Sequence, residues 1–285
     1  MKAFSERYYT SQEGLPLYYR EYGNFDSSAV PVVCLTGLTR NSKDYADLAA
    51  RLSVRRRVIC PDYRGRGRST YDPNWRNYEP STYLNDLRHL LAVTGIRRGV
   101  FIGTSLGGLI ACAMTMVAPA AVAGVVMNDS GPVLERAGIA HILSYIACDR
   151  PQPDWQTAAT HLKEKFPGVA LRDHGEWLRM AHNTYREGAD GKLHFDWDVN
   201  LAKPLRSMRV LPDLWPLFRA IRNVPAVAIR GALSDVLSEE TFRRMGVEKP
   251  DLVRVTIPDV GHAPTLDEPD AVTAIESLLT RIDSA

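Results

Sequence analysis

Cysteine is scarce in this sequence of 285 residues. The four cysteines, Cys34, Cys60, Cys112 and Cys148, are widely spaced, and none forms a Cys-x-x-Cys pair with another. A zinc site of the common kind needs paired cysteines, whereas scattered cysteines in mostly apolar runs are typical of buried thiols in a reducing compartment. We therefore expect a cytoplasmic protein without a disulfide framework.

Long apolar runs and an excess of one charge are missing as well. The most apolar stretch, residues 117–127, is interrupted by Pro119, and the first residues are charged where a signal peptide is apolar. Thirty-five Lys and Arg residues oppose 33 Asp and Glu residues, so the formal charge is only +2. A nucleic-acid binder is usually far more basic. We expect neither a membrane nor a nucleic acid as a partner.

Short apolar strands alternate with amphipathic helices along most of the chain. Strands are predicted at 4–10, 15–22, 32–36, 58–60, 100–103, 122–127, 225–230 and 252–257, and helices at 45–52, 81–93, 106–117, 239–245 and 268–282. This alternation predicts a parallel sheet, because parallel neighbours need a crossover connection. The predicted class is α/β, with a mostly parallel central sheet and helices on both faces.

The alternation stops between residues 133 and 220. Proline, tryptophan and charged residues mix there and no strand stands out, so we predict a helical insertion between a first core part, 1–132, and a second, 221–285. Trp155 and Trp177 in the insertion are candidates for substrate contact, although either one can equally belong to the insertion's own core.

Residues 103–107 read Gly-Thr-Ser-Leu-Gly between a predicted strand and a predicted helix. In that context Gly-x-Ser-x-Gly is typical of a nucleophile elbow, a strained turn that exposes the serine and needs glycine on both sides. An ordinary strand-to-helix turn is the alternative. We interpret Ser105 as a catalytic nucleophile.

A serine nucleophile needs a base, and the base needs an acid to hold its tautomer. His262 follows the last predicted strand, and it is the only one of the seven histidines that follows a core strand. Asp235 follows the strand at 225–230. The chain order Ser105, Asp235, His262 is the order of nucleophile, acid and base that is expected when the serine lies in a nucleophile elbow. Asp129, which ends an earlier strand, is the alternative acid. We favour Asp235.

Metal and nucleotide signatures are not found. Five histidines lie in the insertion, but none forms a His-Glu-x-x-His motif. Gly65-x-Gly67 is too short for a dinucleotide fingerprint, and there is no P-loop sequence. We expect neither a metal nor a cofactor.

The chain resembles α/β-hydrolase fold proteins of the serine-nucleophile type over almost its whole length outside the insertion. Besides the elbow, residues 62–69 (Asp-Tyr-Arg-Gly-Arg-Gly-Arg-Ser) and Gly261-His262 are similar to stretches familiar in that family. The resemblance implies that Asp62 braces loops near the site and that the insertion is a cap over it.

Acyl chemistry also needs donors for a developing oxyanion. The N–H of Leu106, directly after the nucleophile, provides one at a helix start. The resemblance places the other at Leu38 in Thr36-Gly37-Leu38-Thr39, where Thr36 replaces the family's usual histidine. Arg40, just beyond, is either a contact for an acidic substrate group or a structural arginine.

These features predict a serine hydrolase that forms an acyl-enzyme on a small to medium, mainly apolar substrate. An ester, a lactone or a related acyl bond fits this chemistry, with a carboxylic ester favoured. A lyase or cofactor-free oxygenase on the same fold, or a ligand-binding protein without activity, are the alternatives. Oligomeric state cannot be read from one sequence.

Overall fold

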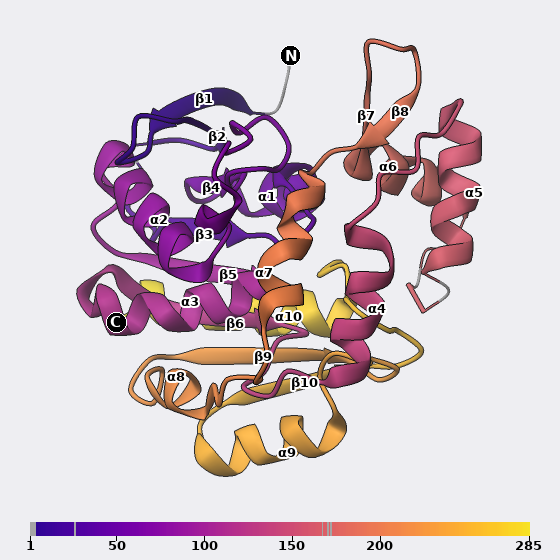
Figure 1. Ribbon diagram of the computed structural model, residues 1–285. Helices are drawn as coiled ribbons and strands as arrows, with labels where there is room; N and C mark the ends of the chain where they lie inside the picture. Colours follow the sequence, from indigo (N-terminus) through magenta and orange to yellow (C-terminus); the bar gives the residue numbers. More distant parts are fainter. Residues whose placement is uncertain (1–3, 26, 167, 170, 172) are drawn as a thin grey trace.

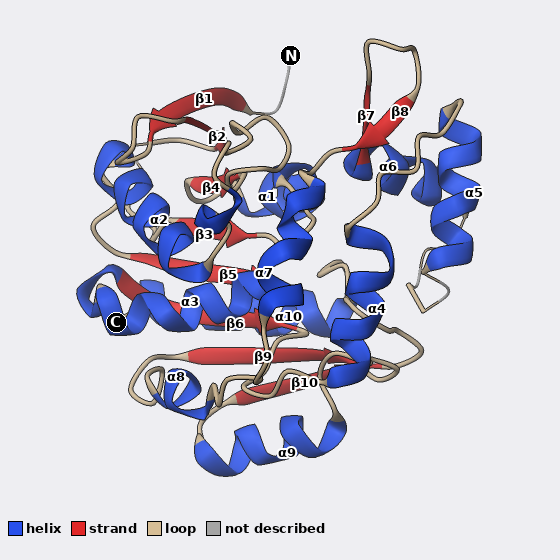
Figure 2. Ribbon diagram, in the orientation of Figure 1, coloured by secondary structure: helices blue, strands red, loops and turns tan. Residues whose placement is uncertain are grey.

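An eight-stranded sheet forms the centre of the molecule (Figures 1 and 2). The computed structural model describes residues 4–285 except 26, 167, 170 and 172. In spatial order the strands are β1 (Ser5–Thr10), β2 (Pro16–Tyr22), β4 (Val58–Pro61), β3 (Val32–Leu35), β5 (Gly99–Thr104), β6 (Val122–Asn128), β9 (Ala226–Gly231) and β10 (Val253–Ile257). β2 is antiparallel to both of its neighbours, and the strands from β4 to β10 are parallel. The predicted mostly parallel sheet is confirmed.

Helices cover both faces of the sheet. One face packs against α1 (Ala46–Leu52) and α10 (Pro269–Asp283), and the other packs against α2 (Pro80–Thr94), α3 (Leu106–Val117), α8 (Trp215–Arg219) and α9 (Glu239–Glu248). Successive side chains of a strand point to opposite faces. Val32 and Cys34 of β3 therefore join the first layer, while Val33 and Leu35 join the second. Both sides of the central strands are buried, as expected for parallel strands.

Between β6 and β9 the chain leaves the sheet. This segment contains α4 (Arg136–Ile146), α5 (Trp155–Lys165), α6 (His174–Thr184), a hairpin of β7 (Tyr185–Glu187) and β8 (Leu193–Phe195), and α7 (Ala202–Ser207), before α8. Figure 1 shows α5, α6 and the hairpin set apart from the sheet, beyond the ends of the parallel strands.

Two details of this segment differ from the sequence prediction. The hairpin was not predicted, because strands of three residues are too short to show a period-two pattern. The last helix, α8, packs against α3, so Trp215 and Phe218 contribute to the core cluster of that face. Four short 3-10 turns complete the described elements: η1 (Ser42–Tyr45), η2 (Trp75–Asn77), η3 (Pro119–Ala121) and η4 (Val199–Leu201). No helix among the described residues is long and apolar enough to span a bilayer.

Candidate active site

Ser105 lies in a tight turn between β5 and α3. Its φ of 53° and ψ of −117° are unusual for a residue with a side chain. A Cβ on Gly103 would overlap the backbone of Gly107, and a Cβ on Gly107 would overlap the carbonyl oxygen of Leu35. The two glycines of the motif are therefore required by close backbone approach, as the sequence pattern predicts for an elbow.

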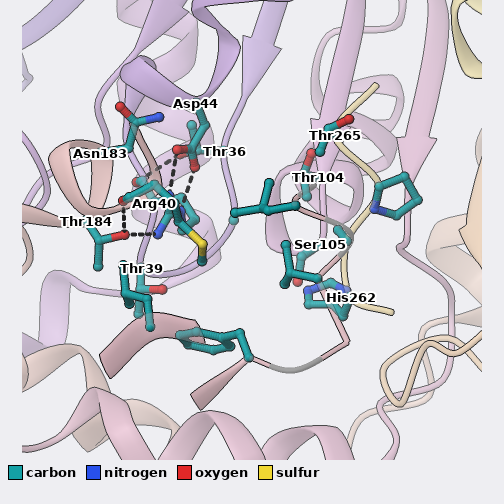
Figure 3. Close-up of a pocket in the computed structure, with 18 of the residues that line it drawn as sticks. Thr36, Thr39, Arg40, Asp44, Thr104, Ser105, Asn183, Thr184, His262 and Thr265 are labelled. Carbon is teal, nitrogen blue, oxygen red and sulfur yellow. Dashed lines mark hydrogen bonds and ion pairs between the residues drawn. The ribbon is translucent and has the colours of Figure 1, made fainter. Parts of the chain in front are cut away.

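His262 comes from the loop between β10 and α10. Figure 3 shows its imidazole beside Ser105 at one end of a cavity. Its Nδ1 lies 2.6 Å from Oδ2 of Asp129, which is fully buried, while 23% of the His262 side chain is exposed. The structure thus brings together three residues from three separate strand ends.

The Asp129 carboxylate is held by several donors. Its Oδ2 also accepts a hydrogen bond of 2.5 Å from the hydroxyl of Ser234, and its Oδ1 accepts one of 3.1 Å from the N–H of Gly231. Asp129 itself has a φ of 46°, and its N–H donates to the carbonyl of Ile229 at 2.8 Å. A buried carboxylate needs such partners, and they fix its orientation toward the imidazole.

Asp235 does not contact His262, which corrects the preferred sequence assignment of the acid. Its Oδ2 lies 3.0 Å from Nδ1 of His141 on α4, and about two fifths of each side chain is exposed. β6 and β9 are adjacent parallel strands, so both of their ends open at the same edge of the sheet. The loop after β9 directs Ser234 inward to Asp129 and Asp235 outward to α4, a difference that chain order does not encode.

Both predicted oxyanion donors belong to segments next to Ser105. A Cβ on Gly37 would lie 3.7 Å from Cβ of Ser105, so the loop that carries Leu38 packs against the nucleophile turn. The carbonyl of Leu38 accepts a hydrogen bond of 2.6 Å from Nε of Arg66. Leu106 is the first residue of α3. Within the described residues, no hydrogen bond from the Leu38 N–H or the Leu106 N–H is found, and Leu38 lines the cavity.

Polar side chains form hydrogen bonds that support the loop carrying Leu38. Thr36 is buried, and its hydroxyl donates to the carbonyl of Arg40 at 3.1 Å. The carboxylate of Asp62 accepts from the N–H of Ser42 at 2.6 Å and from the N–H of Arg68 at 2.9 Å. These bonds support the structural role that the resemblance implies for Asp62.

A cavity of about 310 Å³ opens next to Ser105 and His262. The insertion provides an apolar wall, formed by Ile142, Leu162, Phe166, Val169, Leu171, Met180, Phe195 and Trp197. Hydroxyl groups line other parts of it, on Thr36, Thr39, Thr104, Tyr145, Thr184 and Thr265. The cavity therefore combines an apolar wall with hydroxyl groups and charged side chains, among them Arg40, Asp44, Lys165 and Arg179.

Of the three predicted substrate contacts, only Arg40 lines the cavity. Its Nε and Nη2 each bond the carboxylate of Asp44 at 2.6 Å, and its Nη1 bonds the Thr184 hydroxyl at 2.7 Å. Trp155 instead packs against His182 in a tilted arrangement with ring centroids 3.8 Å apart, and Trp177 is buried in the insertion's core. The tryptophan in the cavity wall is Trp197, and nothing in the sequence separates it from the others.

His161, Tyr145 and Tyr45 line the cavity, lie outside its ion pairs and have perturbed pKa values. Burial is the largest cause of the raised pKa of Tyr45. Burial lowers the pKa of His161, and Lys165 and Arg150 lower it further, so this imidazole is neutral at pH 7. Burial raises the pKa of Tyr145, whose phenol therefore stays protonated. In the part of the chain that the structure describes, no three His, Cys, Asp or Glu side chains gather as a metal site.

The sheet order and the serine turn at the end of β5 define the α/β-hydrolase architecture. Comparison with known proteins agrees. The chain is 30% identical to the 3-hydroxybutyrate-oligomer hydrolase of Cupriavidus necator over 275 residues, 92% of each protein. It is 25% identical over 228 residues to the 2-(acetamidomethylene)succinate hydrolase of Mesorhizobium japonicum, 79% of each.

A solved alpha/beta hydrolase from Novosphingobium aromaticivorans DSM 12444 is 42% identical in sequence. Its TM-score with this structure is 0.92, and the match covers 99% of each chain. Residues 32–275 match the family model for the alpha/beta hydrolases, and the chain belongs to that family. It is an enzyme of the hydrolase class.

Proposed function

We propose that this protein is a serine ester hydrolase whose triad is Ser105, His262 and Asp129. The observation that carries the proposal is the 2.6 Å contact between His262 and the buried Asp129, at the same cavity end as the strained Ser105 turn. The carboxylate holds Nδ1 of the imidazole, which leaves Nε2 free to take a proton from the serine hydroxyl.

The reaction then has two steps. The Ser105 oxygen attacks the ester carbonyl while His262 accepts its proton, and the oxyanion accepts hydrogen bonds from the N–H groups of Leu38 and Leu106. The alcohol leaves with the proton from His262. Water next attacks the acyl-enzyme, His262 removes one proton from it, and the acid departs as Ser105 regains its hydrogen.

The cavity supports a substrate with a small to medium, mainly apolar acyl chain. Its wall comes largely from the insertion, which we propose to act as a cap over the site. The name of the Cupriavidus relative supports a short hydroxyacyl ester, and a lactone fits the same chemistry. A cytoplasmic location is supported by Cys34, Cys60 and Cys112, which are buried and unpaired.

Hydrolysis of p-nitrophenyl acetate and butyrate tests the proposal. The wild-type enzyme should release nitrophenolate from both esters, and Ser105→Ala should lose about a thousandfold or more in kcat, the loss typical of a missing nucleophile. A wild-type protein without esterase activity would favour a lyase, a cofactor-free oxygenase or a ligand-binding role for the same cavity.

A further inference from the structure

A buried junction joins the insertion to the loop that carries Leu38. We call residues 36–44 the oxyanion loop. Oδ2 of Asp196, just after β8, accepts hydrogen bonds from Nδ2 of Asn41 at 3.1 Å and from Nζ of Lys43 at 2.9 Å. Asn41 is 1% exposed and Asp196 is 5% exposed. One carboxylate of the insertion therefore binds two side chains of the oxyanion loop, of which Asn41 is buried and Lys43 is partly exposed.

The end of α6 extends this junction. Three consecutive residues there accept hydrogen bonds from the oxyanion loop: the Thr184 hydroxyl from Arg40 at 2.7 Å, the Asn183 carbonyl from Asn41 at 2.8 Å and the His182 carbonyl from Lys43 at 2.7 Å. Figure 3 shows Arg40 bonded to Thr184 and Asp44, across the cavity from Ser105. The loop is thus fixed to the insertion at several points.

A second connection between the insertion and Leu38 runs through Arg66. Arg66 pairs with Trp197 in an antiparallel bridge, and the N–H of Gly67 donates to the carbonyl of Asp196 at 2.9 Å. The fully buried Arg66 then donates from Nε to the carbonyl of Leu38 at 2.6 Å. The segment after β8 therefore contacts both ends of the oxyanion loop, through Arg66 at one end and through Asp196 at the other.

We propose that Asp196 is a positioning residue that holds the oxyanion loop in its active conformation. The oxyanion hole is then formed only while the insertion is bound to this loop. This proposal rests on the proposed ester hydrolysis. Without the carboxylate, the buried Asn41 Nδ2 keeps only one acceptor, and the partly exposed Lys43 loses its ion pair. Leaving a buried amide with fewer partners is costly. The loop can relieve that cost by shifting, and a shifted Leu38 N–H no longer meets the oxyanion.

Kinetics on two esters test the proposal. In Asp196→Ala we expect kcat for p-nitrophenyl acetate and hexanoate to fall by at least about tenfold, less than the 10²–10³ of a lost oxyanion donor because Arg66 still binds Leu38. The KM values should stay within about twofold. The acetyl group is too short to need the insertion for binding, so a loss on acetate reports the oxyanion loop. Asp196→Asn keeps an acceptor oxygen and should recover most of the activity.

Asp190→Ala is the matched control. Asp190 is also a hairpin carboxylate, and it bonds His194 at 2.9 Å, outside the junction. This variant should keep kcat within about twofold of wild type. Equal kcat losses in the two alanine variants would assign the effect to a loosened insertion and overturn the proposal, as would an Asp196→Ala enzyme with normal kcat or with a raised KM alone.

Hydrogen exchange separates this proposal from the proposed function. Amides of residues 36–44 should exchange faster in Asp196→Ala than in Asp190→Ala if Asp196 holds the loop. Equal exchange in the two variants refutes the coupling. This measurement decides even if the wild-type protein hydrolyses neither ester, which would overturn the esterase assignment alone.

Discussion

The two oxygens of the Asp129 carboxylate make different contacts. Oδ2 meets His262 and the Ser234 hydroxyl, while Oδ1 accepts from the N–H of Gly231. Because no part of the side chain is exposed, water does not compete for these positions. An acid in such a place can fix one imidazole tautomer, which is the task of the third triad member.

A matched pair of variants tests this assignment. Asp129→Asn keeps the shape of the side chain but removes the charge and offers His262 the wrong partner, so kcat for p-nitrophenyl butyrate should fall by about 10³–10⁴. Asp235→Asn changes only a half-exposed contact with His141 and should alter kcat by less than about threefold. A large loss of kcat in Asp235→Asn with little change in Asp129→Asn would assign the acid role to Asp235.

At the residue scale, the sequence places Ser105 and His262 just after core strands, and the structure has them at those positions. Ser105 is flanked by glycines that close packing demands, and His262 follows the last core strand, so each leaves a local pattern. Asp129 and Asp235 each follow a core strand and differ only in which way a loop turns. That turn depends on tertiary contacts, so the sequence alone could not choose between the two carboxylates.

Among the secondary-structure elements, the β7–β8 hairpin contains a histidine, His194, that contacts two carboxylates. His194 contacts Asp149 through Nδ1 at 2.6 Å and Asp190 through Nε2 at 2.9 Å. The hydrogen bond to Asp149 is the largest cause of a raised His194 pKa, and the bond to Asp190 is the next; together they raise it above its ordinary value of 6.5. The hairpin therefore gains stability from a protonated imidazole between two carboxylates.

The sign of the pH effect follows from that raised pKa. Its contribution to stability is fully present below about pH 6.5, the unfolded value, and is lost as pH rises through the folded value. We expect His194→Gln to lower the free energy of unfolding by about 0.5–1 kcal/mol near pH 5.5, because the site is partly exposed, and by less near pH 8.5. Urea unfolding of both proteins at the two pH values measures this. A pH-independent difference would contradict it.

Element prediction succeeded where the hydrophobic period is long enough to detect. The helix predicted at 106–117 is α3 (Leu106–Val117), and the predicted pair of N-terminal strands corresponds to β1 and β2. The hairpin escaped detection because each of its strands has three residues. The contacts that Asp196, just after the hairpin, makes with Asn41 and Lys43 link residues 155 and 153 positions apart and leave no local signal.

At the scale of the whole molecule, the cavity lies between two parts of the fold. The core provides Ser105, His262 and the oxyanion loop, while the insertion provides most of the apolar wall. Under the proposed function the reacting groups come from the core, so a change in an apolar wall residue that does not touch the oxyanion loop should alter chain-length preference without altering the chemistry.

Ile142 offers a test of this separation. It lines the cavity from α4 and is only half-buried, so a larger side chain can enter the cavity without displacing the core. Ile142→Trp should lower kcat/KM for p-nitrophenyl hexanoate by about tenfold or more, because added volume in a closed space is not tolerated, and change acetate turnover by less than about threefold. Ile142→Val is the control of smaller volume. Equal losses on both esters would show that the wall also affects the reacting groups.

The 2.5 Å contact between Ser234 and Asp129 has a consequence for how such sites diverge. The loops after β6 and β9 deliver two side chains to nearly the same point, one a hydroxyl and one a carboxylate. Under the proposed triad, exchanging the residues at positions 129 and 234 is therefore the smallest change that would move the carboxylate from the end of β6 to the loop after β9.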